Sequence, residues 1–185
     1  MTRLPPITNR NDVSIQYQDV FDRITESRGV VDGPFSVHLH SPQAADRIAH
    51  LGTYIRFQST LSPANRELAI IVTSREFDCE FEWSAHEPLA RAAGVSSITI
   101  DIVANQTDTA SLSRIESSIV KYGRELFRNH RVSDETFNEA RSVFGDEGIT
   151  ELTATMGYYG MLACTLNAFE IKPPTDSPLL PQISS

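Results

Sequence analysis

The chain has 185 residues, of which 40% are hydrophobic and 22% are charged. This length and composition suit one globular domain that buries its own core. The formal net charge of −8 at pH 7 disfavours nucleic acid and anionic membranes as partners, because both would repel the chain. Two cysteines are too few for a disulfide framework, and no apolar run predicts a signal peptide or a membrane span. We therefore expect a cytoplasmic protein.

The apolar residues predict a helical domain over residues 13–171, between an extended arm and a tail. Residues 1–12 are rich in proline, asparagine and arginine, and residues 172–185 contain four prolines. Between them, apolar residues recur at helical spacing. The stripes are Tyr17, Val20, Phe21 and Ile24; Ala45, Ile48, Leu51 and Ile55; Leu112, Ile115, Ile119, Tyr122 and Leu126; and Ile149, Leu152, Met156, Tyr159, Ala163 and Leu166.

Capping residues support this helical prediction. Ser62 precedes a proline, which is the pattern of a helix start, and Ser133 begins a short helix that should stop near Gly145. Two segments have patterns that a strand could also show. Residues 68–72 form an apolar run that a buried strand could also show, and residues 98–103 alternate and are rich in β-branched side chains. The flanking signals favour helix for the first, whereas the second stays open and keeps an α/β fold as an alternative.

The residues with the clearest chemical meaning lie between positions 66 and 88. A helix over residues 76–87 would place Cys79, Glu82 and His86 within an arc of roughly 60°. Glu82 and His86 are four residues apart, so the carboxylate could hydrogen-bond the imidazole, as proton transfer near neutral pH requires. Trp83 would stand beside them as an apolar wall. The same pattern also occurs on solvated helix faces, so it does not decide the function alone.

The spacing of these residues resembles the signature of the carboxymuconolactone decarboxylase and alkylhydroperoxidase D superfamily. Glu67, eleven residues, Cys79, two residues, Glu82, three residues and His86 match it, except that a second cysteine stands in the signature where Glu82 stands here. The decarboxylase branch is similar over about residues 3–172. The segments that carry this likeness are Arg28-Gly29, Gly33-Pro34-Phe35, His40-Ser41-Pro42, Leu61-Ser62, Arg66-Glu67-Leu68-Ala69-Ile70, Glu82-Trp83, His86-Glu87, Ala92-Ala93-Gly94, Gly157-Tyr158-Tyr159 and Leu166-Asn167-Ala168-Phe169.

The resemblance implies an all-α fold of about six to eight helices, with the signature helices lining a small buried cavity. It implies a homotrimer or homohexamer, no metal or organic cofactor, and decarboxylation of a small unsaturated lactone carboxylate in aromatic compound catabolism. We assign proton delivery to His86, oriented and tuned by Glu82, and the resemblance implies that Glu67 reaches the same cluster from the preceding helix. The expected catalytic residues are His86, Glu82, Glu67 and Cys79, the expected substrate-binding residues are Trp83, Phe35 and His40, and the candidate anion anchors are Arg56, Arg66 and Arg75.

Other functions remain as alternatives. An isomerase or cyclase of a secondary metabolite could use the same residues, and a non-catalytic oligomer could bind a small molecule there. An alkylhydroperoxidase is disfavoured, because Cys79 has no partner cysteine in its helix and Cys164 is 85 residues away. A metal site at His38 and His40 is also disfavoured, because further ligands at the expected spacing are missing.

Overall fold

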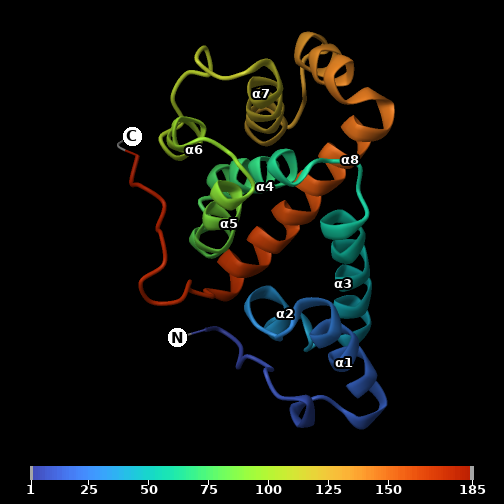
Figure 1. The fold of residues 1–185 in the computed structure, drawn as a ribbon. Coiled ribbons are helices and arrows are strands. Elements are labelled where there is room, and N and C mark those ends of the chain that lie inside the picture. Colours follow the sequence, from blue (N-terminus) through green and yellow to red (C-terminus); the bar gives the residue numbers. More distant parts are fainter. Residues whose placement is uncertain (1, 184–185) are drawn as a thin grey trace. The chain divides into compact units, whose positions relative to one another are not determined.

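The computed structural model describes residues 2–183 of the chain (Figure 1), and within this range the regular structure is entirely helical. This confirms the all-α prediction, and the eight α-helices fall within the expected number. Two 3₁₀ helices, η1 (Arg10–Asp12) and η2 (Ile15–Tyr17), precede α1 (Gln18–Arg28), α2 (Gly33–His38), α3 (Pro42–Phe57), α4 (Pro63–Glu76), α5 (Glu80–Ala92), α6 (Ser97–Ala104), α7 (Arg114–Arg128) and α8 (Asp134–Phe169).

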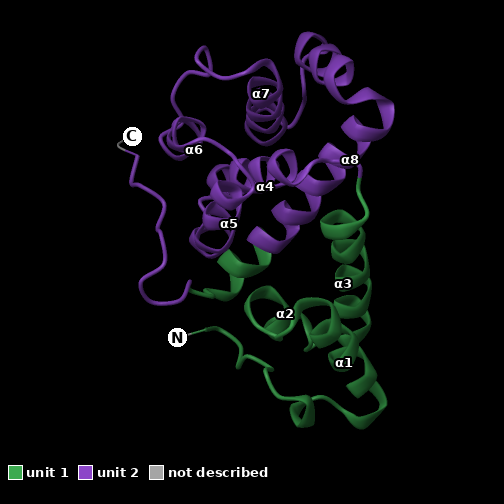
Figure 2. Ribbon diagram, viewed as in Figure 1, with its two compact units in different colours: residues 1–59, 164–172 green, residues 60–163, 173–185 purple. Residues whose placement is uncertain are grey.

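The chain divides into two compact units, which Figure 2 colours separately. Unit 1 comprises residues 1–59 and 164–172, and unit 2 comprises residues 60–163 and 173–185. Helix α8 contributes to both units, and each unit has an apolar cluster of its own. The proposed division into arm, helical domain and tail stays a prediction.

In unit 1, α1 packs against α3, and α2 packs against α3. Val20 and Ile24 of the first predicted stripe are buried. In the second stripe, the prediction that Leu51 is buried is wrong, because this residue is 45% exposed. The buried face of α3 is formed by Ala45, Ala49, Gly52 and Ile55, and Leu51 lies about 100° around the helix from its centre. The apolar spacing therefore identified the helix but placed one of its members on the wrong face.

His38, at the end of α2, should make the stability of unit 1 depend on pH. Its Nε2 lies 3.4 Å from Thr165 Oγ1, and burial lowers the pKa of His38 below its ordinary value of 6.5. The unfolded chain therefore takes up a proton near pH 6.5 that the folded chain binds only at lower pH. We expect the unfolding free energy to fall as the pH drops below about 6.5, by at most about 1.4 kcal/mol per pH unit from this group.

Urea unfolding at a series of pH values from about 7.5 to about 5 would measure this effect. In the His38→Asn variant the side chain cannot titrate, so the loss of stability between these pH values should be smaller than in the parent. An unchanged pH dependence in the variant would show that His38 does not contribute.

In unit 2, α4 packs against α5, α6 and α7 (Figure 1). Ser62 Oγ accepts a hydrogen bond from the backbone N–H of Asn65, and every residue from Glu67 to Arg75 is buried. Residues 68–72 are therefore helical, as predicted. Residues 98–103 lie within α6, so the segment that the sequence left open is also helical. Its β-branched side chains fit a short helix because tertiary burial outweighs a modest difference in propensity.

Close packing in unit 2 requires a glycine in α7. A Cβ at Gly123 would lie 2.6 Å from Val72 Cγ1 of α4 and 3.0 Å from Met156 Cε of α8, so a larger residue would push these helices apart. Helix α8 is interrupted at Gly145, where φ is 70° and ψ is −177°, as the predicted stop near this residue requires. The final stripe from Ile149 to Leu166 is buried throughout, whereas Ile115 of the α7 stripe is 44% exposed.

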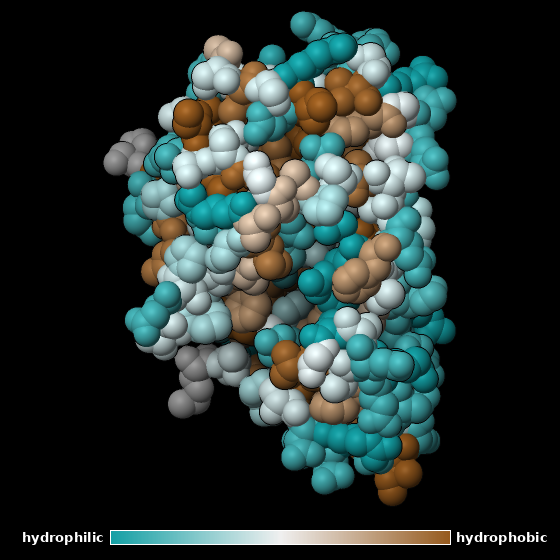
Figure 3. Space-filling view, viewed as in Figure 1, coloured by the Kyte–Doolittle hydropathy of each residue, from teal (hydrophilic) through white to brown (hydrophobic). Residues whose placement is uncertain are grey.

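The surface is mixed in polarity. On the face drawn in Figure 3, hydrophilic residues predominate over unit 1, and hydrophobic residues are scattered among polar ones elsewhere. None of the helices formed by residues 2–183 combines the length and the hydropathy needed to cross a bilayer.

Candidate functional site

The site residues lie on a hairpin of two helices, α4 and α5. Only Phe77, Asp78 and Cys79 join these helices, and Asp78 adopts a positive φ of 46°, which aspartate tolerates better than most residues. Arg75 Nη2 lies 2.6 Å from Asp78 Oδ1 and supports the turn. The expected helix over residues 76–87 is therefore wrong at its start. Helix α5 begins at Glu80, and Cys79 is its N-cap residue rather than a member of a helical face.

The hairpin places Glu67 opposite His86. At about 1.5 Å per residue, Glu67 lies about 13 Å before the end of α4 and His86 about 9 Å after the start of α5. Glu67 Oε2 is 2.7 Å from His86 Nδ1, which is a short hydrogen-bonding distance. Glu82 Oε2 is 3.4 Å from His86 Nε2. The structure thus brings together three of the predicted residues, with each ring nitrogen facing a different carboxylate.

Burial separates this Glu67–His86–Glu82 cluster from bulk water. The side chains of Glu67, Glu82 and His86 are 8%, 5% and 9% exposed. The Tyr159 ring of α8 contacts the His86 ring edge to face, with centroids 5.0 Å apart and planes at 83°. Tyr158 contacts Tyr159 in the same manner, at 5.3 Å. Carboxylates and an imidazole that are buried together interact more strongly than they would on a solvated helix face.

The geometry constrains the number of protons in the cluster. A neutral imidazole carries one N–H, so it can donate toward only one of the two carboxylates that face it. Hydrogen bonds to both carboxylates can form when the imidazole holds two protons, or when one carboxyl group is protonated and donates to the imidazole. A cluster of this kind stores a mobile proton, and the contact of His86 Nε2 with Glu82, at 3.4 Å, is the looser of the two.

Tyr159 was missed as a site residue by the sequence reasoning. It appeared only as a member of the apolar stripe of the last helix and within the Gly157-Tyr158-Tyr159 segment. Periodicity shows that such a residue is buried but not which helix it meets, because that depends on the packing of α8. The tyrosine pair in the family-like segment was the one available signal.

The remaining predicted residues have separate surroundings. Cys79 is fully buried, and Trp83 is 3% exposed within the apolar cluster of unit 2. Phe35 and His40 belong to unit 1. The Arg28 guanidinium lies 4.0 Å from the centroid of the Phe35 ring, and His40 Nε2 lies 2.8 Å from the carbonyl oxygen of Pro5. Roles in catalysis or substrate binding for these residues, and the small cavity, stay predictions.

The three candidate arginines differ in what they contact. Arg75 Nη1 donates to the carbonyl oxygen of Pro181 and Arg75 Nη2 pairs with Asp78. Arg56, in unit 1, lies over the Phe57 ring, with 5.4 Å between its Cζ and the ring centroid. Arg66 alone of the three lies against the cluster, with Nε 3.6 Å from Glu67 Oε1.

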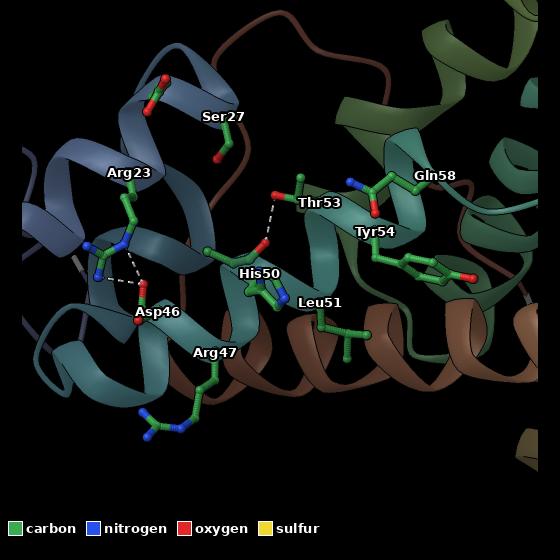
Figure 4. Close-up of a pocket in the computed structure, with 11 residues that line it drawn as sticks. Arg23, Ser27, Asp46, Arg47, His50, Leu51, Thr53, Tyr54 and Gln58 are labelled. Atoms are coloured by element: carbon green, nitrogen blue, oxygen red, sulfur yellow. Dashed lines mark hydrogen bonds and ion pairs between the residues drawn. The ribbon is translucent and has the colours of Figure 1, made fainter.

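Unit 1 has a groove of about 880 Å³, shown in Figure 4. Its lining residues come from α1, from α3 and from the residue that follows α3: Arg23, Glu26, Ser27, Asp46, Arg47, Ala49, His50, Leu51, Thr53, Tyr54 and Gln58. Arg23 and Asp46 turn toward each other and form an ion pair at 2.9 Å. The volume suits a small molecule. The groove nevertheless lacks the buried imidazole–carboxylate contacts of the α4–α5 hairpin, because its histidine, His50, is exposed.

The alternative metal site at His38 and His40 gains no further ligands from the fold. Across the described part of the chain, no three histidine, cysteine, aspartate or glutamate side chains are grouped so that they could hold a metal ion.

Comparisons with known proteins agree with this fold. Residues 42–125, which include Glu67, Glu82 and His86, match the model of the carboxymuconolactone decarboxylase family. No curated protein matches the sequence.

Similar solved structures share the helical arrangement at low identity. A peroxidase-related protein with an alkylhydroperoxidase AhpD core from Ralstonia eutropha JMP134 has a TM-score of 0.75 and 17% identity, covering 95% of this chain and 93% of that one. The debrominase Bmp8, as a cysteine-to-alanine variant in complex with 2,3,4-tribromopyrrole, has a TM-score of 0.73 and 16% identity, covering 95% of both chains. A peroxidase-related protein from Silicibacter sp. TM1040 has a TM-score of 0.72 and 17% identity, covering 95% and 96%. Residues 42–125 are therefore similar to the carboxymuconolactone decarboxylase family, and the chain has the alkylhydroperoxidase D-like helical fold.

Proposed function

We propose that this protein is a decarboxylase that needs no cofactor and acts on a small unsaturated lactone carboxylate such as carboxymuconolactone. The observation that carries the proposal is the buried imidazole of His86 between two carboxylates, at 2.7 Å from Glu67 and 3.4 Å from Glu82. The match of residues 42–125 to the model of the carboxymuconolactone decarboxylase family supports the choice of reaction.

The reaction requires one proton at carbon and no external electron acceptor. When the carbon–carbon bond to the carboxylate breaks, carbon dioxide leaves and the electron pair moves into the conjugated lactone carbonyl, giving a dienolate. His86 then donates the proton on Nε2 to a carbon of the dienolate, and the imidazole later regains a proton from water. The overall change is therefore the substrate carboxylate plus one proton giving the product and carbon dioxide.

The two carboxylates have different tasks in this mechanism. Glu67 contacts His86 through Nδ1, so the ring keeps one orientation. Glu82 faces Nε2 at a longer distance, so the proton on Nε2 is held less tightly and is the one available to substrate. Tyr159 packs against the ring and restricts its rotation.

Thiol chemistry is the rival that the similar structures raise, because two are peroxidase-related proteins and one is a debrominase. The chain has Glu82 where the alkylhydroperoxidase signature has its second cysteine, and its other cysteine, Cys164, is 85 residues from Cys79. A peroxidase cycle that needs a resolving cysteine is therefore disfavoured.

Incubation of the purified protein with carboxymuconolactone tests the proposal directly. We expect release of carbon dioxide and loss of the substrate absorbance without an added metal or cofactor. Reduction of an alkyl hydroperoxide and release of bromide from 2,3,4-tribromopyrrole, each with a thiol reductant, are the control assays. Turnover in either control and none with the lactone would overturn the proposal in favour of thiol chemistry.

A further inference from the structure

Arg66 is a partly buried cation for which the mechanism above has no use. Its side chain is 16% exposed, and its Nε lies 3.6 Å from Glu67 Oε1. Successive residues on a helix point about 100° apart. The Arg66 side chain must therefore fold across the surface of α4 to reach the carboxylate of its neighbour.

The Nε–H of Arg66 is buried and has no hydrogen-bond partner in the structure. The distance to Glu67 is that of an ion pair and is too long for a hydrogen bond. Buried donors are nearly always satisfied, so an orphan donor beside a reactive cluster points to an acceptor that arrives with the substrate. A carboxylate is the acceptor that matches a guanidinium best, because its two oxygens can take two parallel N–H groups.

The charges of the cluster lead to the same conclusion. With His86 protonated, Glu67, Glu82 and His86 together carry one negative charge, which would repel an anionic substrate. Arg66 brings the total to zero, so that a carboxylate can enter without meeting net negative charge. Arg75 Nε is also buried without a hydrogen-bond partner, but its Nη1 and Nη2 are held by Pro181 and Asp78, and so Arg75 is less available for this task.

Arg66 should not hold the carboxylate that leaves. The negative charge of that group disappears as carbon dioxide forms, so a guanidinium bound to it would stabilise the ground state more than the transition state and slow the reaction. A carboxylate that stays on the substrate keeps its charge throughout and can be held without this cost. We propose, on the basis of the decarboxylase function above, that Arg66 is the specificity-determining residue that binds a non-reacting carboxylate of the substrate.

Muconolactone tests this assignment, because it keeps one carboxylate on a lactone but lacks the carboxylate that would be lost. We expect isothermal titration calorimetry to show that Arg66→Gln weakens muconolactone binding by on the order of 10- to 100-fold, whereas binding of muconolactone methyl ester changes little. Arg66→Lys should retain part of the affinity, because it keeps the charge but loses the paired donors. Arg114→Gln, which removes an equal charge from an exposed ion pair in the same unit, is the matched control.

Because binding is measured without turnover, the two proposals fail separately. If Arg66→Gln loses the same affinity for muconolactone and for its methyl ester, or loses none for either, the role of Arg66 is overturned even if carbon dioxide is released. If Arg66→Gln loses affinity only for the free acid, and the parent protein releases no carbon dioxide, the role of Arg66 is supported and the decarboxylase function is overturned. Circular dichroism and the thermal midpoint check that Arg66→Gln and Arg66→Lys are folded. If only Arg66→Lys folds, a ratio of acid to ester affinity equal to that of the parent overturns the proposal.

Discussion

His86→Ala should lower the rate of carbon dioxide release by on the order of 10²- to 10⁴-fold, which is the usual contribution of a positioned general acid. His86 is the one group in the cluster that touches both carboxylates, through Nδ1 at 2.7 Å and Nε2 at 3.4 Å. Without the imidazole, the cluster loses the proton donor that both glutamates face. The loss should appear in kcat, because protonation of carbon occurs after the substrate is bound.

Steady-state kinetics with circular dichroism and a solution mass measurement would check this result. The variant should keep its helicity and its oligomeric state, and added imidazole should restore part of the rate by entering the space that the side chain leaves. His50→Ala is the matched control, because His50 is an exposed histidine on α3 of unit 1. A His86→Ala protein that turns over at the parent rate would remove His86 from the mechanism.

Much of the helical structure could be predicted from the sequence because its signals are local. Ser62 with Pro63 marks the start of α4, and the glycine at 145 breaks α8, since capping and positive φ depend on the residues themselves. The four-residue spacing of Glu82 and His86 is likewise a property of one helix. These features needed no knowledge of how the helices pack.

The predictions that were wrong or incomplete concern features that depend on packing between helices. The sequence paired His86 chiefly with Glu82, yet the shorter contact is with Glu67, because the reversal at Asp78 brings α4 against α5. Leu51 fits the spacing of a core residue, but the face of α3 that is buried depends on where α1 lies. The contact between Tyr159 and His86 joins residues that are far apart in the chain, so no local pattern could predict it.

Residues 98–103 were left open by the sequence. Alternation and β-branched side chains are typical of a strand, whereas the protein forms a helix of eight residues that buries Thr99, Ile100, Ile102 and Val103. Ser96 accepts the backbone N–H of Thr99 and starts the helix. A capping residue and a neighbouring helix to pack against therefore decided the conformation of a segment with ambiguous spacing.

The two glutamates should differ in importance, in the reverse of the order that their sequence spacing favours. Glu67→Gln should lower kcat by about 10²- to 10³-fold, because the imidazole loses the carboxylate that faces Nδ1 at 2.7 Å and orients the ring. Glu82→Gln should lower kcat by roughly tenfold, since the Glu82 oxygen is 3.4 Å from His86 Nε2 and the attraction is weaker at that distance. KM should change much less than kcat in both variants.

The comparison is a matched one, because the two substitutions remove the same charge and preserve nearly the same volume. Both side chains are buried to a similar degree, at 8% and 5% exposure, so a difference in their effects would reflect geometry rather than solvation. Equal losses would show that the imidazole shares its protons evenly between the carboxylates. A larger loss for Glu82→Gln would mean that the proton held toward Nδ1 is the mobile one, and the direction of proton delivery assigned to His86 would have to be reversed.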